Sequence, residues 1–359
     1  MNADKKAIFS CLPVLSAFIC VHLRFQKFLC AVVLFGSFTL PAQAVSVAEY
    51  PALAGLIDSL VTEHGFDRGA LERLFAGASL QPQVVAAISQ PHEAAPWHVY
   101  RRGFLNEERI KLGARFWRMN RDTLARAERV YGVPPELIVA IIGVETRYGI
   151  HQGSHAVLDS LLTLTLDYPR RADFFRKELE QFLLLTRELG IDPSGVKGSY
   201  AGALGIPQFI ASSYRRYAVD FDGDSRRDLF DDNVDAIGSV ANFLSLHGWA
   251  PGQPIVDAAR VPALPTPWPG PRAAEPLLTL RQWHTYGVEP ARNGGTPAAA
   301  AGGGDRAAAL ITLQGESGPL YHFGYENFLV ITRYNRSHNY AMAVYELARM
   351  IRARYQLES

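Results

Sequence analysis

The stretch PPELIVAIIGVETRYG, residues 134–149, decides the fold. Its two prolines suit the start of a helix, because proline has no N–H to lose in the first turn and its φ is already helical. The run from Leu137 to Val144 is apolar on every helical face, which predicts a helix that is buried all round. Glu145 ends this run, and Gly149 offers a natural stop for the helix.

Glu145 is the candidate functional residue of this stretch. A carboxylate at the end of an apolar helix is desolvated, which disfavours its charged form and raises its pKa. A glutamic acid that stays protonated near neutral pH can donate a proton to a glycosidic oxygen. The alternative is a helix-end carboxylate paired with Arg147 or with another surface cation, and these residues alone leave both interpretations open.

The first 44 residues differ from the rest of the 359-residue chain. Two apolar runs, 7–21 and 28–40, each follow basic residues, and the segment ends in Pro-Ala-Gln-Ala. A basic start, an apolar run and a small-x-small site predict a secretory signal peptide at 1–44, cleaved after Ala44. The second run is a complete signal by itself, so we expect translation to begin later than Met1. Neither run reaches the roughly 20 residues that a membrane-spanning anchor needs.

Composition excludes several kinds of site. All three cysteines lie in the predicted signal peptide, which excludes disulfides, thiolate metal sites and cysteine catalysis from the mature chain. No small residue precedes Cys30, so we do not expect a lipoprotein. The signal segment holds four basic residues and one acidic residue, which leaves 32 Lys and Arg against 34 Asp and Glu. Nucleic-acid-binding proteins carry a basic excess, so we expect no nucleic-acid partner.

Periodicity predicts a mainly α (α+β) fold in four parts after the signal peptide. These parts are an N-terminal helical region at 45–129, a core at 130–250, a Pro/Gly/Ala-rich insertion with weak strands at 251–318, and a segment at 319–359 that returns to the core. Within them we expect helices at 167–189, 236–247 and 340–355, weak strands at 276–283 and 309–314, and a strand or short helix at 327–332.

A glycine-rich loop follows the predicted helix at 167–189. Four glycines between 195 and 205 let the backbone approach another group closely. Ser199 and Gln208 can then present a hydroxyl and an amide to a polar substrate. A purely structural turn is the alternative, because no phosphate-loop spacing is present.

An aspartate-rich loop comes next. Asp220, Asp222 and Asp224 stand at positions 1, 3 and 5, and a later carboxylate follows, as in an oxygen-rich calcium loop. The loop departs from the common twelve-residue pattern, because position six is not glycine and position twelve is Asp231 rather than glutamate. The closing ligand is Asp231 or, in a longer loop, Asp235. A solvated acidic turn is the alternative, although acids packed this tightly repel one another without a cation.

Aromatic and basic residues recur elsewhere in the chain, at Trp97, Tyr100, 167–171, 332–335 and Tyr340. Aromatic faces stack on sugar rings, and arginine and asparagine bind hydroxyls, amides and carboxylates. Each of these residues alone fits the core or a rim equally well. His151 and His155 are four apart, but the glycines beside them make a continuous helix doubtful, so we do not expect a zinc site.

Together these stretches resemble the lytic murein transglycosylase B family, peptidoglycan-cleaving enzymes with a lysozyme-like core. The resemblance rests on ordered motifs from about residue 97 to the C-terminus: GVETRYG at 143–149, YPRR at 168–171, KGSYAG at 197–202, QF at 208–209, SSY at 212–214, VDF at 219–221, DAIGSVAN at 235–242 and TRYN at 332–335. Several ordered motifs are far more specific than any one of them.

The resemblance implies that Glu145 is the sole catalytic acid and base. It would protonate the bond between MurNAc and GlcNAc and then take a proton from the MurNAc 6-hydroxyl, which attacks its own C1 and gives a 1,6-anhydro end. It also implies that a set of polar and aromatic residues lines the glycan cleft: Tyr100, Arg170, Arg171, Ser199, Gln208, Phe243, Tyr334, Asn335 and Tyr340. The acidic loop would hold structural calcium through Asp220, Asp222, Asp224, Arg226 and Asp235.

The chain departs from the family pattern at three places. Phe243 stands where the family often has tyrosine, Ala211 replaces a usual proline, and the acidic loop is one residue longer near 232–233. The expected protein is a monomeric periplasmic enzyme that acts on peptidoglycan glycan strands, with cell-wall synthesis or division proteins as further partners. The alternatives are a hydrolytic muramidase on the same scaffold and a non-catalytic peptidoglycan-binding scaffold.

Overall fold

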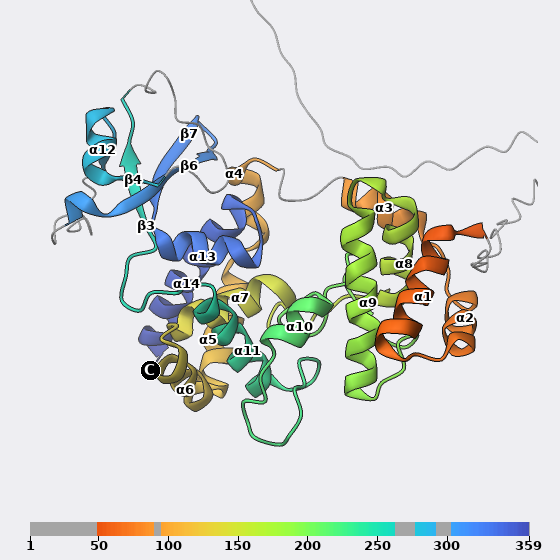
Figure 1. Ribbon diagram of the computed structural model, residues 1–359. Coiled ribbons are helices and arrows are strands. Elements are labelled where there is room, and N and C mark those ends of the chain that lie inside the picture. Colours follow the sequence, from red (N-terminus) through yellow and green to blue (C-terminus); the bar gives the residue numbers. More distant parts are fainter. Residues whose placement is uncertain (1–48, 90–94, 263–276, 292–302, 359) are drawn as a thin grey trace, which may run out of the picture. The chain divides into compact units, whose positions relative to one another are not determined.

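The computed structural model describes residues 49–89, 95–262, 277–291 and 303–358 (Figure 1). The predicted signal peptide and most of the Pro/Gly/Ala-rich insertion lie outside these residues. Within them, no helix is both long and apolar enough to span a membrane.

Helices dominate the described residues, as predicted. They are α1 (Pro51–His64), α2 (Arg68–Ala76), α3 (Pro82–Ser89), α4 (Trp97–Tyr100), α5 (Glu107–Met119), α6 (Arg121–Tyr131), α7 (Pro135–Thr146), α8 (Val157–Asp167), α9 (Ala172–Leu189), α10 (Ala211–Tyr217), α11 (Asn233–Leu246), α12 (Leu280–Thr285), α13 (Glu326–Tyr334) and α14 (His338–Glu358). Short 3-10 turns cover η3 (Arg101–Gly103), η4 (Pro169–Arg171) and η6 (Gly303–Asp305).

A small antiparallel sheet has the strand order β4-β6-β7-β3-β5. Figure 1 labels β3, β4, β6 and β7 of this sheet. Its strands are β3 (Val256–Arg260), β4 (Leu278–Thr279), β5 (Glu289–Pro290), β6 (Ala307–Gln314) and β7 (Pro319–Gly324). In the central ladder Ile311 lies opposite His322. The sheet and α12 enclose a separate apolar cluster that includes Trp283 and Phe323. A second pair, β1 (His155–Ala156) and β2 (Lys197–Gly198), leads into the glycine-rich loop.

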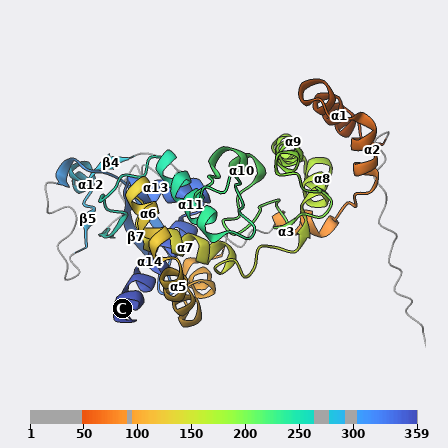
Figure 2. The same cartoon turned by 90° about the horizontal axis from the view of Figure 1, so that it is seen from below.

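Helix α7 is central to the main core, as its apolar sequence predicts. Every residue from Leu137 to Val144 is buried, and the helix contacts α5, α6, α11 and α14. Figures 1 and 2 show these helices grouped around α7. Because α7 is buried on all sides, the direction of its last turn fixes where the Glu145 side chain emerges.

The end of α7 corrects the sequence-based expectation. The helix ends at Thr146, before Gly149, and the C-cap is Arg147 with φ of 54°. Tyr148 also has a positive φ, of 65°. Glycine at 149 is therefore not the residue that stops the helix, because two bulky residues before it already take the left-handed conformation.

Other elements match or refine the predictions. The strand predicted at 309–314 is confirmed as part of β6, and 327–332 lies in the helix α13. The long helix predicted from Asp167 begins only at Ala172, after Pro169 opens a 3-10 turn. The strand predicted at 276–283 is wrong for most of its length, because Thr279 and Gln282 form a capping box that starts α12.

Helix packing crosses the predicted boundary at residue 129. Helices α1 and α3, before that boundary, contact α9 and α8 after it, whereas α5 and α6 pack on α7. Sequence order alone carries no such information, since the contacts join segments far apart in the chain. The domain boundaries predicted from sequence remain predictions.

Candidate active site

Glu145 lies in the last turn of α7 and is half-buried. The next residue, Thr146, is fully buried, and its hydroxyl donates to the Ile206 carbonyl at 2.8 Å. The same oxygen accepts the Gly149 N–H at 2.9 Å. Thr146 therefore ties the end of the helix to the loop that carries Gln208.

The turn after Glu145 is held from two further sides. The Tyr148 hydroxyl donates to the Arg109 carbonyl at 2.8 Å, and the Arg109 guanidinium donates to the Gly143 carbonyl near the end of α7. Arg147 forms its ion pair with Glu108 on α5. Among the described residues, the ion pair found for Arg147 is with Glu108 and not with Glu145.

Glu145 instead accepts a hydrogen bond from a tyrosine at the far end of the chain. The Tyr340 hydroxyl donates to Glu145 Oε1 at 2.6 Å, and this tyrosine on α14 is only 2% exposed. Burial, and then the charge of Glu145, raises the pKa of Tyr340 well above its ordinary value. Tyr340 consequently stays protonated at neutral pH and remains a hydrogen-bond donor to the carboxyl group.

A group of aromatic rings continues from Tyr340. The ring of Tyr334 is stacked on that of Tyr340, with centroids 6.4 Å apart and an interplanar angle of 11°. Its hydroxyl donates to the Pro207 carbonyl at 2.5 Å. Burial raises the pKa of Tyr334 too, and the charge of Glu145 adds to this rise. The two tyrosines thus connect the carboxyl group to the 204–212 segment.

Phe243 belongs to the same aromatic group. Its ring centroid lies 4.9 Å from that of Tyr334, 5.6 Å from that of Phe209 and 4.0 Å from that of His247. Phe243 is only 6% exposed, and its ring packs edge-on against the ring of Tyr334. The hydroxyl that a tyrosine would add at this position is absent.

Gln208 and Ser199 have constrained side chains. Gln208 has φ of 53°, and its amide nitrogen donates to the Gln152 and Gly205 carbonyls, both at 2.9 Å. Both amide hydrogens are therefore used, and the side-chain oxygen is the group left for an outside donor. The Ser199 hydroxyl accepts the N–H groups of Ala201 and Ala203 at 3.2 and 2.9 Å, and no acceptor for its own proton is found among the described residues.

The other predicted cleft residues occupy different settings. Tyr100 is buried near Tyr340. After burial and other causes, its interaction with Tyr340 adds to the rise in the pKa of Tyr340. Asn335 is half-buried at the C-cap of α13. Arg170 and Arg171 are exposed on η4, where Arg171 lies over the Phe174 ring at 4.2 Å.

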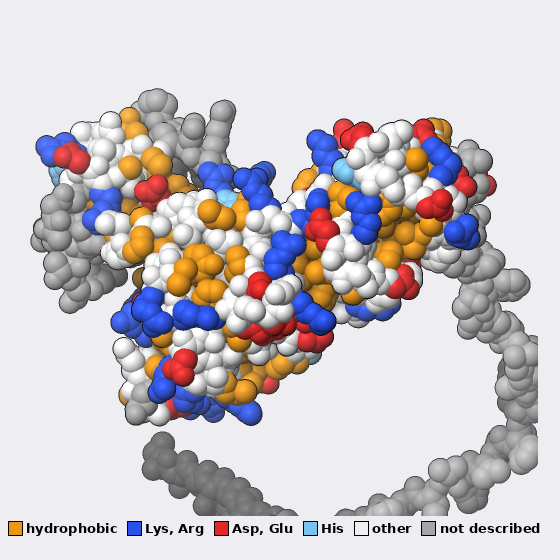
Figure 3. All heavy atoms as spheres, turned by 60° about the horizontal axis from the view of Figure 1, so that its bottom comes forward, with side chains coloured by type: hydrophobic (Ala, Val, Ile, Leu, Met, Phe, Trp, Pro, Cys, Tyr) orange, Lys and Arg blue, Asp and Glu red, His pale blue; other side chains and the backbone are white. Residues whose placement is uncertain are grey.

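The aspartate-rich loop connects α10 to α11. On the face shown in Figure 3, small groups of acidic side chains lie among basic ones. One carboxylate oxygen from each of Asp220, Asp222 and Asp235 lies within 4.8 Å of the other two. Calcium binds oxygen at about 2.3–2.6 Å. Two oxygens on opposite sides of one ion are therefore separated by twice that distance, roughly 5 Å. This donor set fits a calcium ion, and it includes Asp235 rather than Asp231.

Asp235 is the buried member of this group, with 1% of its surface exposed. It accepts the Phe221 N–H at 2.6 Å and the Asp228 N–H at 2.8 Å, and burial raises its pKa despite these donors. Asp224 is exposed and lies outside the group of three, and the backbone N–H of Arg226 donates to it at 2.7 Å. The roles predicted for Asp224 and Arg226 remain predictions.

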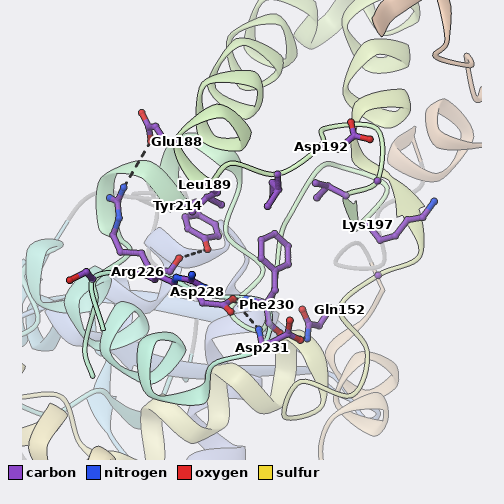
Figure 4. A pocket seen from close by; sticks show the side chains of 16 residues that line it. Gln152, Glu188, Leu189, Asp192, Lys197, Tyr214, Arg226, Asp228, Phe230 and Asp231 are labelled. Carbon is purple, nitrogen blue, oxygen red and sulfur yellow. Dashed lines mark hydrogen bonds and ion pairs between the residues drawn. The ribbon is translucent and has the colours of Figure 1, made fainter. Parts of the chain in front are cut away.

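A separate pocket of 1010 Å³ lies beside this loop (Figure 4). Its lining includes Glu188 at the end of α9, Lys197 of β2, and the rings of Tyr214 and Phe230. None of the described residues that line it is Glu145, Tyr340 or Gln208. We therefore assign the candidate active site by the chemistry around Glu145 and not by cavity size.

Sequence reasoning missed the residues that hold Glu145 in place. Thr146 and Tyr148 stand within the GVETRYG motif, so their position beside the acid was a usable signal. Arg109 gives no such signal, because its contact with Gly143 depends on the packing of α5 against α7.

Comparisons with known proteins point to one family. The family model for the transglycosylase SLT domain matches residues 48–349. Membrane-bound lytic murein transglycosylase B of Escherichia coli (strain K12) is 41% identical over 317 residues, which cover 85% of this chain and 83% of that protein.

Solved structures are similar over most of their length. Lytic transglycosylase SltB1 from Pseudomonas aeruginosa is 43% identical, with a TM-score of 0.77 over 85% of this chain and 98% of that one. Escherichia coli Slt35 in complex with calcium is 38% identical, with a TM-score of 0.77 over 89% and 98%. Pseudomonas aeruginosa SltB3 in complex with NAG-NAM-pentapeptide is 32% identical, with a TM-score of 0.70 over 84% and 79%.

These likenesses confirm the predicted mainly helical, lysozyme-like fold and the predicted resemblance. The family model covers most of the chain, and the relatives exceed 30% identity over more than two thirds of it. The chain therefore belongs to the lytic murein transglycosylases with a transglycosylase SLT domain.

Proposed function

We propose that this lytic transglycosylase cleaves the MurNAc–GlcNAc bond of peptidoglycan with Glu145 as its only general acid and base. The observation that carries the proposal is the 2.6 Å hydrogen bond from Tyr340 to a half-buried carboxyl group at the end of a buried helix. The two fully buried acids in the described part of the chain, Glu178 and Asp235, accept hydrogen bonds elsewhere, from Ser212 and from the aspartate-rich loop. The proposal therefore assigns both proton transfers to Glu145.

The reaction proceeds in two steps at Glu145. The protonated carboxyl group gives its proton to the glycosidic oxygen as the C1–O bond of MurNAc breaks, and GlcNAc leaves with a hydroxyl. The resulting carboxylate then takes the proton of the MurNAc 6-hydroxyl while that oxygen bonds to C1. The products are a free GlcNAc end and a 1,6-anhydro-MurNAc end, and no water is consumed.

Tyr340 keeps the Glu145 carboxyl group in one orientation through both steps. Its hydroxyl donates to the carboxylate formed after the first transfer, when a hydrogen bond is worth most. A hydrolytic muramidase is the alternative. It would need a second carboxylate to activate water or to act as a nucleophile.

Glycan binding is proposed for the polar groups near Glu145. The free Gln208 oxygen accepts from a sugar hydroxyl or amide, and the free Ser199 proton donates to a sugar oxygen. Arg170 and Arg171 bind carboxylates or hydroxyls farther along the strand. Pseudomonas aeruginosa SltB3, a relative, forms a complex with NAG-NAM-pentapeptide, which supports a peptidoglycan substrate.

Calcium is proposed as a structural ion. Asp220, Asp222 and Asp235 would hold it, since their oxygens lie at suitable separations. The ion would neutralise their mutual repulsion and fix the loop that leads into α11. The complex of Escherichia coli Slt35 with calcium supports this assignment.

A periplasmic location is proposed from the predicted signal peptide at 1–44 and from the proposed substrate, with the protein acting as a monomer. Cell-wall synthesis or division proteins are further proposed partners. The relative from Escherichia coli is a membrane-bound enzyme.

Mass spectrometry of products from purified peptidoglycan tests the chemistry. The protein from Val45 onward should release muropeptides that end in anhydro-MurNAc, one water lighter than hydrolysed fragments. Glu145→Gln should abolish this release while it leaves folding and glycan binding intact. Reducing-end MurNAc would instead indicate hydrolysis, and wild-type turnover by Glu145→Gln would refute the assignment of the acid.

A further inference from the structure

The joint between α9 and α10 contains a buried acid that the proposed chemistry does not use. Glu178, on α9, is 5% exposed. Its Oε2 accepts the Ser212 N–H at 3.1 Å, and its Oε1 accepts the Ser212 hydroxyl at 2.6 Å. Both carboxylate oxygens are thus occupied by one serine in the first turn of α10.

Placing a carboxyl group in this helix–helix contact costs free energy of folding. Burying a carboxylate costs several kilocalories per mole unless strong partners compensate, and an apolar side chain would fill the same space without that cost. No ion pair to Glu178 occurs between described residues. The gain is geometric, because two hydrogen bonds to one serine fix the position of that serine against α9.

The segment attached to Ser212 includes Gln208. Upstream of Gln208, the Ile206 carbonyl accepts from Thr146 at 2.8 Å, and the Pro207 carbonyl accepts from Tyr334 at 2.5 Å. These bonds hold one end of the segment against the residues around Glu145. The bonds to Glu178 hold the other end, four residues after Gln208, against α9.

Glu178 lies on the helix that directly follows the turn with the predicted arginine subsite. Helix α9 begins at Ala172, directly after Arg170 and Arg171, and Glu178 stands in its second turn. A shift of the 204–212 segment along α9 would therefore change the position of Gln208 relative to the arginines. The partly exposed pair of Arg215 with Glu188, at 2.7 Å, links the same two helices. Arg215 donates to Glu188 from both Nε, at 3.0 Å, and Nη2, so this pair is a second link between the two helices, placed farther along α9 than Glu178.

We propose that Glu178 is a positioning residue, which sets the spacing between Gln208 and the Arg170–Arg171 turn so that one glycan strand contacts both. This proposal rests on the proposed function, in which these residues bind the glycan. Glu178 touches no substrate and no reacting atom. Its loss weakens binding of the strand and leaves the proton transfers at Glu145 unchanged.

Kinetics on isolated glycan strands test the proposal. Glu178→Ala should raise KM about tenfold, because misplaced binding groups lose contacts made equally in the ground and transition states. Its kcat should change little. Glu178→Gln should recover most of the binding, since the amide oxygen accepts the Ser212 N–H and the amide N–H can donate to the hydroxyl oxygen.

Two further variants separate positioning from stability. Ser212→Ala should raise KM, and the double variant with Glu178→Ala should add little, because the two residues form one interaction. Leu179→Val, at the neighbouring buried position of α9, should lower Tm without raising KM. An equal rise in KM for Leu179→Val would overturn the proposal, and so would a wild-type KM for Glu178→Ala.

Failure of the proposed function gives a different result. Wild-type protein that releases no anhydro-MurNAc from strands refutes the chemistry. Titration of the same strands into Glu145→Gln protein then still measures binding. In that background Glu178→Ala should weaken affinity about tenfold if the spacing matters, and equal affinity would refute this inference alone.

Discussion

The hydrogen bond from Tyr340 to Glu145 gives a quantitative prediction for Tyr340→Phe. The substitution removes one hydroxyl and keeps the ring that stacks on Tyr334. Tyr340 is nearly fully buried, so the lost donor is not replaced by bulk water without rearrangement. The change therefore isolates the hydrogen bond from the packing.

The size of the effect follows from the type of bond. A hydrogen bond to a charged group contributes about 1.5–3 kcal/mol. If this whole free energy stabilises the transition state, in which the Glu145 carboxylate forms, its loss should lower kcat about 10- to 150-fold. A change of 1.36 kcal/mol corresponds to a factor of ten in rate. The glycan contacts proposed for Gln208, Ser199 and the two arginines are unaffected, so KM should change little.

The dependence of the rate on pH gives a second, independent prediction for Tyr340→Phe. A hydroxyl that donates to a carboxylate favours the ionised form, so its loss lets Glu145 stay protonated to higher pH. The proposed first step needs the protonated acid, and the alkaline limb of the rate profile should therefore move to higher pH. Tyr340 itself does not titrate in this range, since burial and then the charge of Glu145 raise its pKa well above the ordinary value.

Initial rates of anhydro-muropeptide release across the acid and neutral range measure both effects. Tyr345→Phe, on the same helix but beside Arg349, is the matched control and should keep the wild-type rate and profile. A wild-type kcat and alkaline limb for Tyr340→Phe would refute the role given to this bond. A large fall in Tm would show that the hydroxyl acts on folding instead.

Gly143→Ala should destabilise the protein by about 1–3 kcal/mol, the usual cost of overpacking, because a Cβ there would lie 2.6 Å from the Tyr148 hydroxyl. Thermal unfolding measures this, with Gly55→Ala as the control; nothing lies within 4 Å of its Cβ, and alanine in a helix should stabilise. Equal Tm values for the two variants would contradict the packing argument. Chelation should lower Tm, and calcium should restore about 2.7 kcal/mol when present at 100 times its Kd. Asp235→Asn should lose this response, and a full calcium response would rule out the assigned ligands.

Local sequence was sufficient for features that depend on neighbouring residues. The uninterrupted apolar run predicts the all-round burial of α7, because a helix with no polar face has none to expose. The spacing of Asp220 and Asp222 predicts that their carboxylates converge, since both belong to one short loop. The apolar setting of Glu145 made it a candidate acid, although these residues alone left pairing with a surface cation open.

Features that depend on distant segments were not predictable from local pattern. Tyr340 is 195 positions from Glu145, and only the packing of α14 on α7 brings the hydroxyl to the carboxyl group. The resemblance placed Tyr340 near the glycan, but gave no partner for it. The stop at Arg147 was missed for a similar reason, because glycine is the ordinary residue at a left-handed position and tertiary contacts override that preference here.

The turn after Glu145, at residues 146–149, is held by several contacts with distant segments. A residue held in a sparsely populated conformation costs about 1–3 kcal/mol, and Arg147 and Tyr148 both have positive φ. Thr146, the Tyr148 hydroxyl and the pair of Arg147 with Glu108 each fix this turn from a different side. A relaxed turn with glycine at these positions would end the helix at lower cost but would leave Glu145 free to rotate. The strained turn and its contacts therefore act as one unit, which holds the carboxyl group against Tyr340.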